Sequence, residues 1–301
     1  MVSRIRSAIA GYPELATVLL AAVIGLLVQS PLAWIASHQG INALLAVLVL
    51  ATAVTIEPAA LRQTARAWRT LAVALAAGIT VLPLLSWAVA FLAPPGPLRD
   101  GLLTVGLAPC EIASMATTAM AGGDAALSAG VLIGSTLTTV ILAGPVLTLE
   151  AGHAGVSPGS VAGNLALVVA LPLAAGIAAR WRVAVIARWE RPAGLTVLVT
   201  VALLVALISA EVHLSARYLT VAIALLAFLA GSAVLGWLLG LSSRPPARAA
   251  LLLTTSMRDF AIAAGLAAAA FGAAAAAPLG LYGILVLVWG TAAAGFRRQR
   301  G

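Results

Sequence analysis

Ten long apolar runs make up most of the chain. Short segments rich in Arg, Pro, Gly and acidic residues separate them. Each run is continuously apolar and lacks the alternation of a half-buried strand, so each run predicts a helix. About 20 apolar residues cross the roughly 30 Å of hydrocarbon in a bilayer. The pattern therefore predicts an all-α integral membrane protein with ten transmembrane spans, at 14–33, 41–57, 70–92, 99–121, 125–149, 159–179, 194–210, 217–240, 248–271 and 276–296.

The composition excludes an ordinary soluble domain. Hydrophobic residues make up 62% of the 301 residues, charged residues make up 9%, and mean hydropathy is +1.11, whereas soluble chains carry about 25% charged residues. The net charge of +8 comes from Arg in short loops between apolar runs, which does not indicate a nucleic-acid surface. The spans hold neither a Ser/His/Asp set nor zinc-ligand spacing, so we expect that the protein is not an enzyme. The single Cys excludes an internal disulfide.

The distribution of Arg predicts the orientation of the chain, because cytoplasmic loops carry an excess of positive charge. With the N-terminus inside, fourteen of the 17 Arg lie in cytoplasmic segments, Arg99 and Arg217 lie outside, and Arg258 lies within a span. We therefore expect a multi-pass protein of the plasma (inner) membrane with both termini in the cytoplasm.

The spans also repeat. Starts of spans five apart differ by 145 to 153 residues, and Ser114–Met115 in the fourth span corresponds to Ser256–Met257 in the ninth. Because five is odd, the second half enters the membrane from the opposite side. This pattern is typical of the inverted repeats of secondary transporters, and it predicts two five-helix units at 1–150 and 151–301.

Ionisable residues in two corresponding spans are candidates for a functional site. Glu111 follows Pro109 in the fourth span, and Arg258 and Asp259 lie near the middle of the ninth. Since Pro109 removes a backbone donor, we expect the fourth helix to open there. Charges inside a membrane are costly and mark function. Two interpretations stay open: Arg258 forms a structural ion pair with Glu111 across the crossing spans, or these groups act directly in binding and coupling.

Other polar residues have simpler interpretations. Asp124, after two Gly, predicts the N-cap of the fifth span. Cys110 is typical of a small apolar core residue. Ser128 and Thr136 are eight residues apart, so they share a face of the fifth span, which we expect to look toward the fourth.

A series of residues, mostly in the fourth and fifth spans, carries a family resemblance. These residues are Gly101–Pro109, Ala113–Ser114, Gly123–Ser128, Ser135–Thr138 and Pro145, with Thr55–Pro58, Pro83 and Met257 elsewhere. Taken in chain order, these residues resemble those of the bile acid:sodium symporter family. The resemblance implies a panel domain (spans 1, 2, 6 and 7) and a core domain (spans 3–5 and 8–10). It also implies that spans 4 and 9 are broken and cross, with a solute, typically an organic anion, bound between panel and core.

The first sodium site that this resemblance implies is altered in the present chain. Ser114 and Ser128 match the family. Met115, however, stands at an Asn position, Leu132 at a hydroxyl position and Thr254 at a Glu position.

The second implied sodium site is altered more strongly. Gly78 and Arg258 stand at Gln positions, and Thr254 again stands at the Glu position. Sodium needs several oxygen ligands, whereas a guanidinium near the site could replace the charge of the ion. We therefore expect altered coupling: proton-linked through Glu111 or Asp259, uniport, or one residual sodium site with Ser114 and Ser128 as ligands.

Two alternative functions are weighed against this one. Arsenite efflux permeases of the same superfamily carry an Ala-Pro-Cys like Ala108–Cys110, and an acid in the ninth span where Phe260 stands beside Asp259. A non-transporting structural or receptor-like membrane protein is the other alternative, but it leaves Glu111 and Arg258 unexplained.

We therefore expect a secondary transporter that moves a small organic solute, for which Arg258 favours an anion. We expect no cofactor beyond a coupling sodium ion or proton, and no partner beyond the solute and the bilayer. The residues expected to bind the solute are Glu111, Ser114, Met115, Thr254, Thr255, Arg258 and Asp259. The residues expected to couple the ion are Glu111, Ser114, Ser128 and Asp259.

Overall fold

The chain is helical throughout the part that the structure, a computed structural model, describes. The described residues are 13–56, 64, 67–151, 157–182, 190–212 and 217–298. Both ends of the chain and several Arg that carry the orientation prediction lie outside these residues, so the side of the membrane on which each terminus lies stays a prediction.

The helices follow the apolar runs closely. Their bounds are α2 Pro13–Leu27, α3 Gln29–Ile35, α4 Ile41–Thr55, α6 Trp68–Ala90, α7 Pro97–Leu107, α8 Ala113–Met120, α9 Ala125–Ala151, α10 Pro158–Leu165, α11 Leu171–Arg182, α12 Glu190–Ala210, α13 Arg217–Leu239, α14 Pro245–Ser256, α15 Phe260–Phe271 and α16 Ala277–Arg298. A kink within Ala36–Gly40, where His38 and Gln39 leave the helical conformation, joins α3 to α4, and a short π-helical turn, Ala166–Ala170, joins α10 to α11. A 3-10 turn, Ala273–Ala276, precedes α16.

Seven of the described helical segments are long and apolar enough to cross a membrane. They are Gln29–Thr55, Trp68–Ala90, Ala125–Glu150, Pro158–Arg182, Pro192–Ala210, Arg217–Leu239 and Ala273–Ala293. The chain is therefore an all-helical, multi-pass membrane protein, as the sequence predicts. The number of ten spans and the two inverted units stay predictions.

Two of the predicted spans differ from the rest because each is divided. The run at 99–121 becomes α7 and α8, and the run at 248–271 becomes α14 and α15. Pro83 and Pro145, by contrast, lie inside helices that continue past them. A proline alone therefore does not explain where this chain interrupts its helices.

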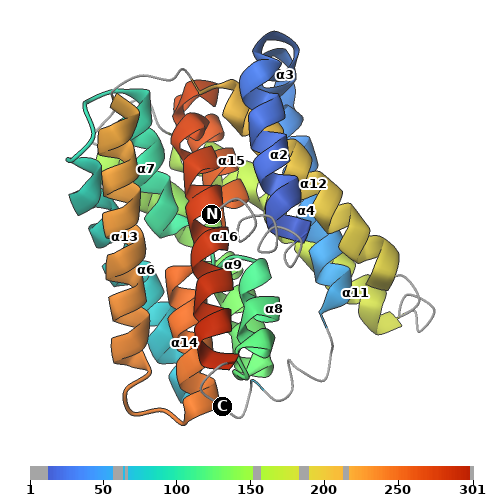
Figure 1. Cartoon of the computed structure of the whole chain (residues 1–301), viewed down its shortest axis with the longest axis vertical. Helices are drawn as coiled ribbons and strands as arrows, with labels where there is room; N and C mark the ends of the chain where they lie inside the picture. Colours follow the sequence, from blue (N-terminus) through green and yellow to red (C-terminus); the bar gives the residue numbers. More distant parts are fainter. Residues whose placement is uncertain are drawn as a thin grey trace, which may run out of the picture.

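The helices pack in two groups with α16 between them (Figure 1). In one group α12 packs against α2 and α4, and α11 packs against α4. In the other, α6 packs against α7 and α13, and α13 packs against α14. Helix α16 contacts members of both groups, including α12 and α7. Each group has the size of a small helical bundle, and the divided helices α7 and α14 lie in the second.

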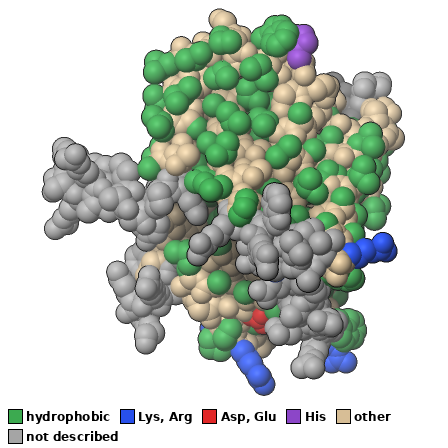
Figure 2. Space-filling model, turned by 90° about the vertical axis from the view of Figure 1, so that its right-hand side faces the viewer, with side chains coloured by type: hydrophobic (Ala, Val, Ile, Leu, Met, Phe, Trp, Pro, Cys, Tyr) green, Lys and Arg blue, Asp and Glu red, His purple; other side chains and the backbone are tan. Residues whose placement is uncertain are grey.

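The outer surface is apolar, as a lipid-facing surface must be. Leu27, Leu84, Ile141 and Leu149 are exposed large hydrophobic residues, and Leu149 is 83% exposed. Figure 2 shows hydrophobic side chains over most of the upper part of one face, with Arg side chains in the lower part. Together with helices long and apolar enough to cross a membrane, these exposed hydrophobic side chains fit a surface that faces lipid.

Candidate functional site

The two interrupted helices meet at their interruptions. Helix α7 ends at Leu107, where Ala108 turns to an extended conformation (φ −63°, ψ 150°) before Pro109. Helix α14 ends at Ser256, and Met257 is extended (φ −91°, ψ 103°). Cys110 and Arg258 then pair as a short antiparallel β-bridge. We call this arrangement the bridge.

The bridge provides hydrogen-bond partners for backbone groups that lose their helical partners at the interruptions. Glu111 N–H donates to the Met257 carbonyl at 2.7 Å, and Asp259 N–H donates to the Pro109 carbonyl at 2.9 Å. Unpaired backbone groups are costly at membrane depth, so non-helical backbone persists there only when other groups pair with it. Each interruption therefore supplies the partners of the other, which explains why α14 and α15 are separated without a proline.

Residues of α9 complete the pairing of the first interruption. Ser135 Oγ accepts a hydrogen bond from Cys110 N–H at 3.1 Å. Thr139 Oγ1 donates to the Leu107 carbonyl at 2.8 Å. The hydroxyl groups of α9 thus have a structural part in holding the opened segment.

Two carboxylates accept hydrogen bonds from backbone N–H groups at the N-terminus of α15. Asp259, 1% exposed, is its N-cap and accepts a hydrogen bond from Ile262 N–H at 2.8 Å. Glu111, 5% exposed, accepts one from Phe260 N–H at 3.4 Å. The N-terminus of a helix carries partial positive charge, so both acids are electrostatically favourable there.

The ion pair that the sequence suggested between Glu111 and Arg258 is absent between these two described residues. In an antiparallel pair neighbouring side chains point to opposite faces. Because Cys110 faces Arg258 across the bridge, Glu111 and Asp259 point to the other face. Arg258 instead donates through Nη2 to the carbonyl of Ala108.

Arg258 is buried and incompletely paired. Its side chain is 4% exposed, and its buried Nε has no hydrogen-bond partner in the described part of the chain. The bridge brings the segments that carry Arg258, Glu111 and Asp259 together, without the expected ion pair between Glu111 and Arg258.

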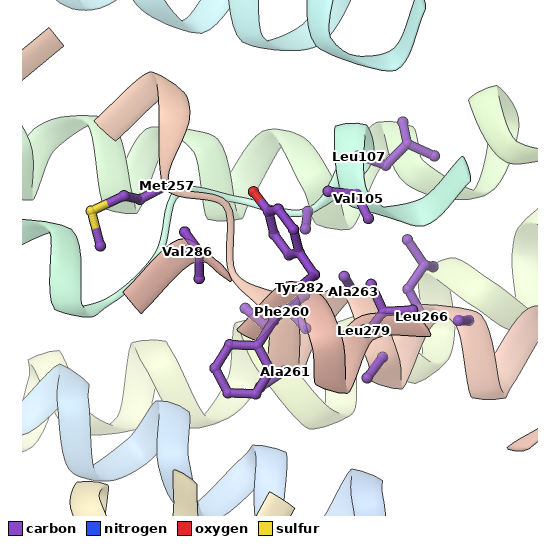
Figure 3. Packing of buried hydrophobic residues seen from close by; sticks show 14 of the residues in the cluster. Val105, Leu107, Met257, Phe260, Ala261, Ala263, Leu266, Leu279, Tyr282 and Val286 are labelled. Atoms are coloured by element: carbon purple, nitrogen blue, oxygen red, sulfur yellow. The ribbon is translucent and has the colours of Figure 1, made fainter. Parts of the chain in front are cut away.

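Helix α16 supports the second interruption through residues that sequence reasoning missed. The Tyr282 hydroxyl accepts from Arg258 N–H at 3.3 Å and donates to the Ser256 carbonyl at 3.4 Å. Trp289 Nε1 donates to Ser256 Oγ at 2.8 Å. Figure 3 shows the Tyr282 hydroxyl directed toward the extended segments, with Phe260 on the opposite side of the helix start. A buried Tyr or Trp needs a hydrogen-bond partner for its polar atom. This requirement was the only feature of the sequence that could have pointed to Tyr282 and Trp289.

Two cavities flank the bridge. The first, which we call the Arg258 pocket, lies between α6, α7, α9 and α14. Of the predicted site residues, Thr254, Thr255 and Arg258 line it. The second, the α4 cavity, is lined by Val49, Thr52, Ile112, Leu132, Thr136, Val169, Leu173 and Ile262. The predicted solute residues therefore do not share one cavity.

Three buried hydroxyls near the start of α9 lack partners. Ser114, Thr118 and Ser128 are each 0% exposed, and their oxygens make no hydrogen bond within the described residues. Met115, beside Ser114, is partly buried and packs against the hydrophobic core. Helices α8 and α9, which carry the three hydroxyls, are in contact.

Two simpler predictions are confirmed. Asp124 Oδ1 accepts a hydrogen bond from Leu127 N–H at 2.9 Å, which is the cap expected at the start of α9. Cys110 is fully buried within the core. Among the described residues no three His, Cys, Asp or Glu are grouped as metal ligands would be.

Comparison with known proteins identifies the family to which this chain belongs. The model of the sodium bile acid symporter family matches residues 42–222. The chain belongs to this family. A curated relative, the uncharacterized sodium-dependent transporter YocS of Bacillus subtilis (strain 168), is 29% identical over 162 residues. That alignment covers 53% of this chain and 50% of the relative, so the chain matches about half of the relative's length.

Proposed function

We propose that this member of the sodium bile acid symporter family is a secondary transporter that moves a small organic anion by alternating access. In this proposal ten spans form two inverted units, 1–150 and 151–301. Spans 1, 2, 6 and 7 form the panel, and spans 3–5 and 8–10 form the core. The protein lies in the plasma (inner) membrane with both termini in the cytoplasm. It is not an enzyme.

The bridge is the observation that carries the proposal. Interrupted helices in transporters expose polar backbone and side-chain groups at mid-membrane, where a solute or ion binds. Here the interruptions bury three ionisable side chains, those of Arg258, Glu111 and Asp259, among apolar helices. A merely structural helix would be more stable without them, because burying a charge is costly. The three buried ionisable side chains therefore support a site that binds or couples.

The coupling that we propose differs from that of the family's sodium sites. At the second site, Arg258 occupies one ligand position and Gly78 offers no side chain. A fixed guanidinium there supplies the positive charge that an ion would otherwise bring. At the first site, Ser114 and Ser128 keep unpartnered hydroxyls that suit a residual sodium ion. Glu111 and Asp259 are the candidates for proton coupling.

The experiment is uptake into proteoliposomes under imposed gradients. A thermal-shift screen of carboxylates and sulfonates on purified protein first selects a ligand. Its radiolabelled form is then offered with a sodium gradient, a proton gradient, or neither. We expect saturable uptake and counterflow that persist without sodium. Strict dependence on sodium would refute the altered coupling, and flux that neither saturates nor counterflows would refute a transporter.

A gain-of-function variant sharpens this test. The double substitution T254E/R258Q restores the residues that the family resemblance implies at positions 254 and 258. We expect this variant to require sodium for uptake, whereas the wild-type protein does not. R258Q alone serves as the control, because it removes the fixed charge without adding a carboxylate; we expect weak uptake with or without sodium.

A further inference from the structure

The Arg258 pocket has one positive charge and few free hydrogen-bond donors. Four of the five hydroxyls that line it already use their protons on backbone carbonyls: Ser135 donates to Leu132 and Thr138 to Ser135, and Thr139 donates to Leu107. Thr254 likewise donates to the Ala250 carbonyl at 2.7 Å. Such hydroxyls can still accept hydrogen bonds, but they do not donate to an anion.

The guanidinium is therefore the charged donor that the pocket offers to a negatively charged ligand, and the Thr255 hydroxyl, which also lines the pocket, is a neutral donor. Arg258 Nη2 is engaged with the Ala108 carbonyl, while Nε is buried without a partner among the described residues. A buried charge that is incompletely paired costs free energy, and an anion in the adjoining pocket would recover part of it through its attraction to the guanidinium. Neither Glu111 nor Asp259 forms a hydrogen bond with the guanidinium; their carboxylates accept from backbone N–H groups of α15.

The rest of the pocket is aliphatic. The side chains that form its walls are Ala74, Leu75, Ile79, Leu82, Pro83, Val131, Leu142, Ala143 and Val146. Walls of this kind exclude water and favour a hydrocarbon body beside the charged group. Gly78 also lines the pocket, and a Cβ added there would meet no heavy atom within 4 Å. The pocket thus has open space opposite its walls.

From these features we infer that the Arg258 pocket binds a compact monocarboxylate, whose carboxylate contacts the Arg258 guanidinium and whose short hydrocarbon part contacts the walls. The inference rests on the proposed function, since it names the class of anion that the transporter takes. It also places the anion on the α6 side of the bridge, apart from the α4 cavity. A dianion is disfavoured because its second charge would lie against aliphatic walls without a partner.

The test is direct binding to the full-length protein in detergent, measured by calorimetry. The probes are propanoate, its neutral isostere propanamide, the dianion malonate, and chloride. We expect saturable binding of propanoate, and weaker binding of the other three by about tenfold or more, because each lacks either the single charge or the hydrocarbon part.

Two variants locate the site. R258Q removes the charge, and we expect it to weaken propanoate binding by about tenfold or more. G78L fills the open space without removing any charge, and it also replaces a helical Gly by a better helix former; we expect it to abolish binding. G163L is the matched control, because a Cβ at Gly163 in α10 also meets nothing within 4 Å and Gly163 does not line the pocket. Thermal denaturation verifies that each variant is folded.

The outcomes separate this inference from the proposed function. Equal binding of malonate or chloride, or unchanged propanoate binding by folded G78L, would overturn the inference. The proposed function would survive that result if another organic anion shows counterflow in proteoliposomes. Binding of propanoate that G78L abolishes and R258Q weakens by about tenfold or more supports the pocket assignment, even if the same preparation shows no flux and the transport proposal fails.

Discussion

The N-cap of α15 offers the sharpest test of how the bridge is held together. In the structure Asp259 Oδ1 accepts a hydrogen bond from Ile262 N–H at 2.8 Å, and the Asp259 side chain is 1% exposed. Replacing Asp259 by Ala removes this acceptor and the negative charge at the helix start. Loss of an N-cap costs about 0.5–2 kcal/mol, and loss of a charge at a helix N-terminus costs about 0.3–1 kcal/mol.

Together these terms predict that D259A weakens the first turn of α15 by about 1–3 kcal/mol. If that turn exchanges by local opening, protection of its amides falls by about 5- to 150-fold, since about 1.4 kcal/mol corresponds to a factor of ten. D259N keeps an acceptor and loses only the charge, so we expect it to lie at the lower end of this range.

The assay is hydrogen–deuterium exchange by mass spectrometry on protein in lipid nanodiscs, read on a peptide that covers residues 259–266. D124A is the matched control, because Asp124 caps α9 in the same way, with Leu127 N–H at 2.9 Å. It should raise exchange at the start of α9 and leave α15 unchanged. Exchange in α15 that is the same in D259A and wild type would show that Asp259 does not hold this turn, and the reasoning would be wrong.

Three further predictions concern the surroundings of the bridge. W289F removes the indole N–H that donates to Ser256 Oγ and should lower the free energy of unfolding by about 1 kcal/mol, seen as a lower melting temperature; an unchanged melting temperature would contradict this. G106A adds a Cβ that collides with the carbonyl oxygen of Leu82, so we expect a loss of about 1–3 kcal/mol, and normal stability would show that α7 can shift away from α6. Cys110, at 0% exposure, should resist maleimide in native protein and react only after denaturation; rapid native labelling would place it in an open site.

Most of the fold could be predicted from the sequence because lipid simplifies the physics. Continuous apolar runs admit one backbone solution, so the helix positions followed directly. The first interruption was also predictable, because Pro109 lies beside polar residues. Pro83 and Pro145 show the limit of that reasoning: both are inside continuous helices, since neighbouring groups can compensate for a single proline.

The bridge itself could not be predicted, because it joins residues about 150 positions apart through backbone atoms. The sequence indicated that Glu111 and Arg258 would be close, and opposite charges suggested a pair. The alternation of side chains across a β-bridge separates them, which depends on the register Cys110–Arg258 and not on charge. Tyr282 and Trp289 were missed because an apolar span hides which face of a helix meets an interruption.

Sodium-free counterflow is the most direct test of the central claim, that Arg258 at the bridge supplies a built-in positive charge for an organic anion. Proteoliposomes loaded with unlabelled propanoate would be diluted into labelled propanoate, with choline replacing sodium on both sides. The account predicts transient accumulation of label by the wild-type protein, equal in choline and in sodium, and its loss in R258Q. Accumulation that needs sodium, or that R258Q leaves intact, would contradict the account.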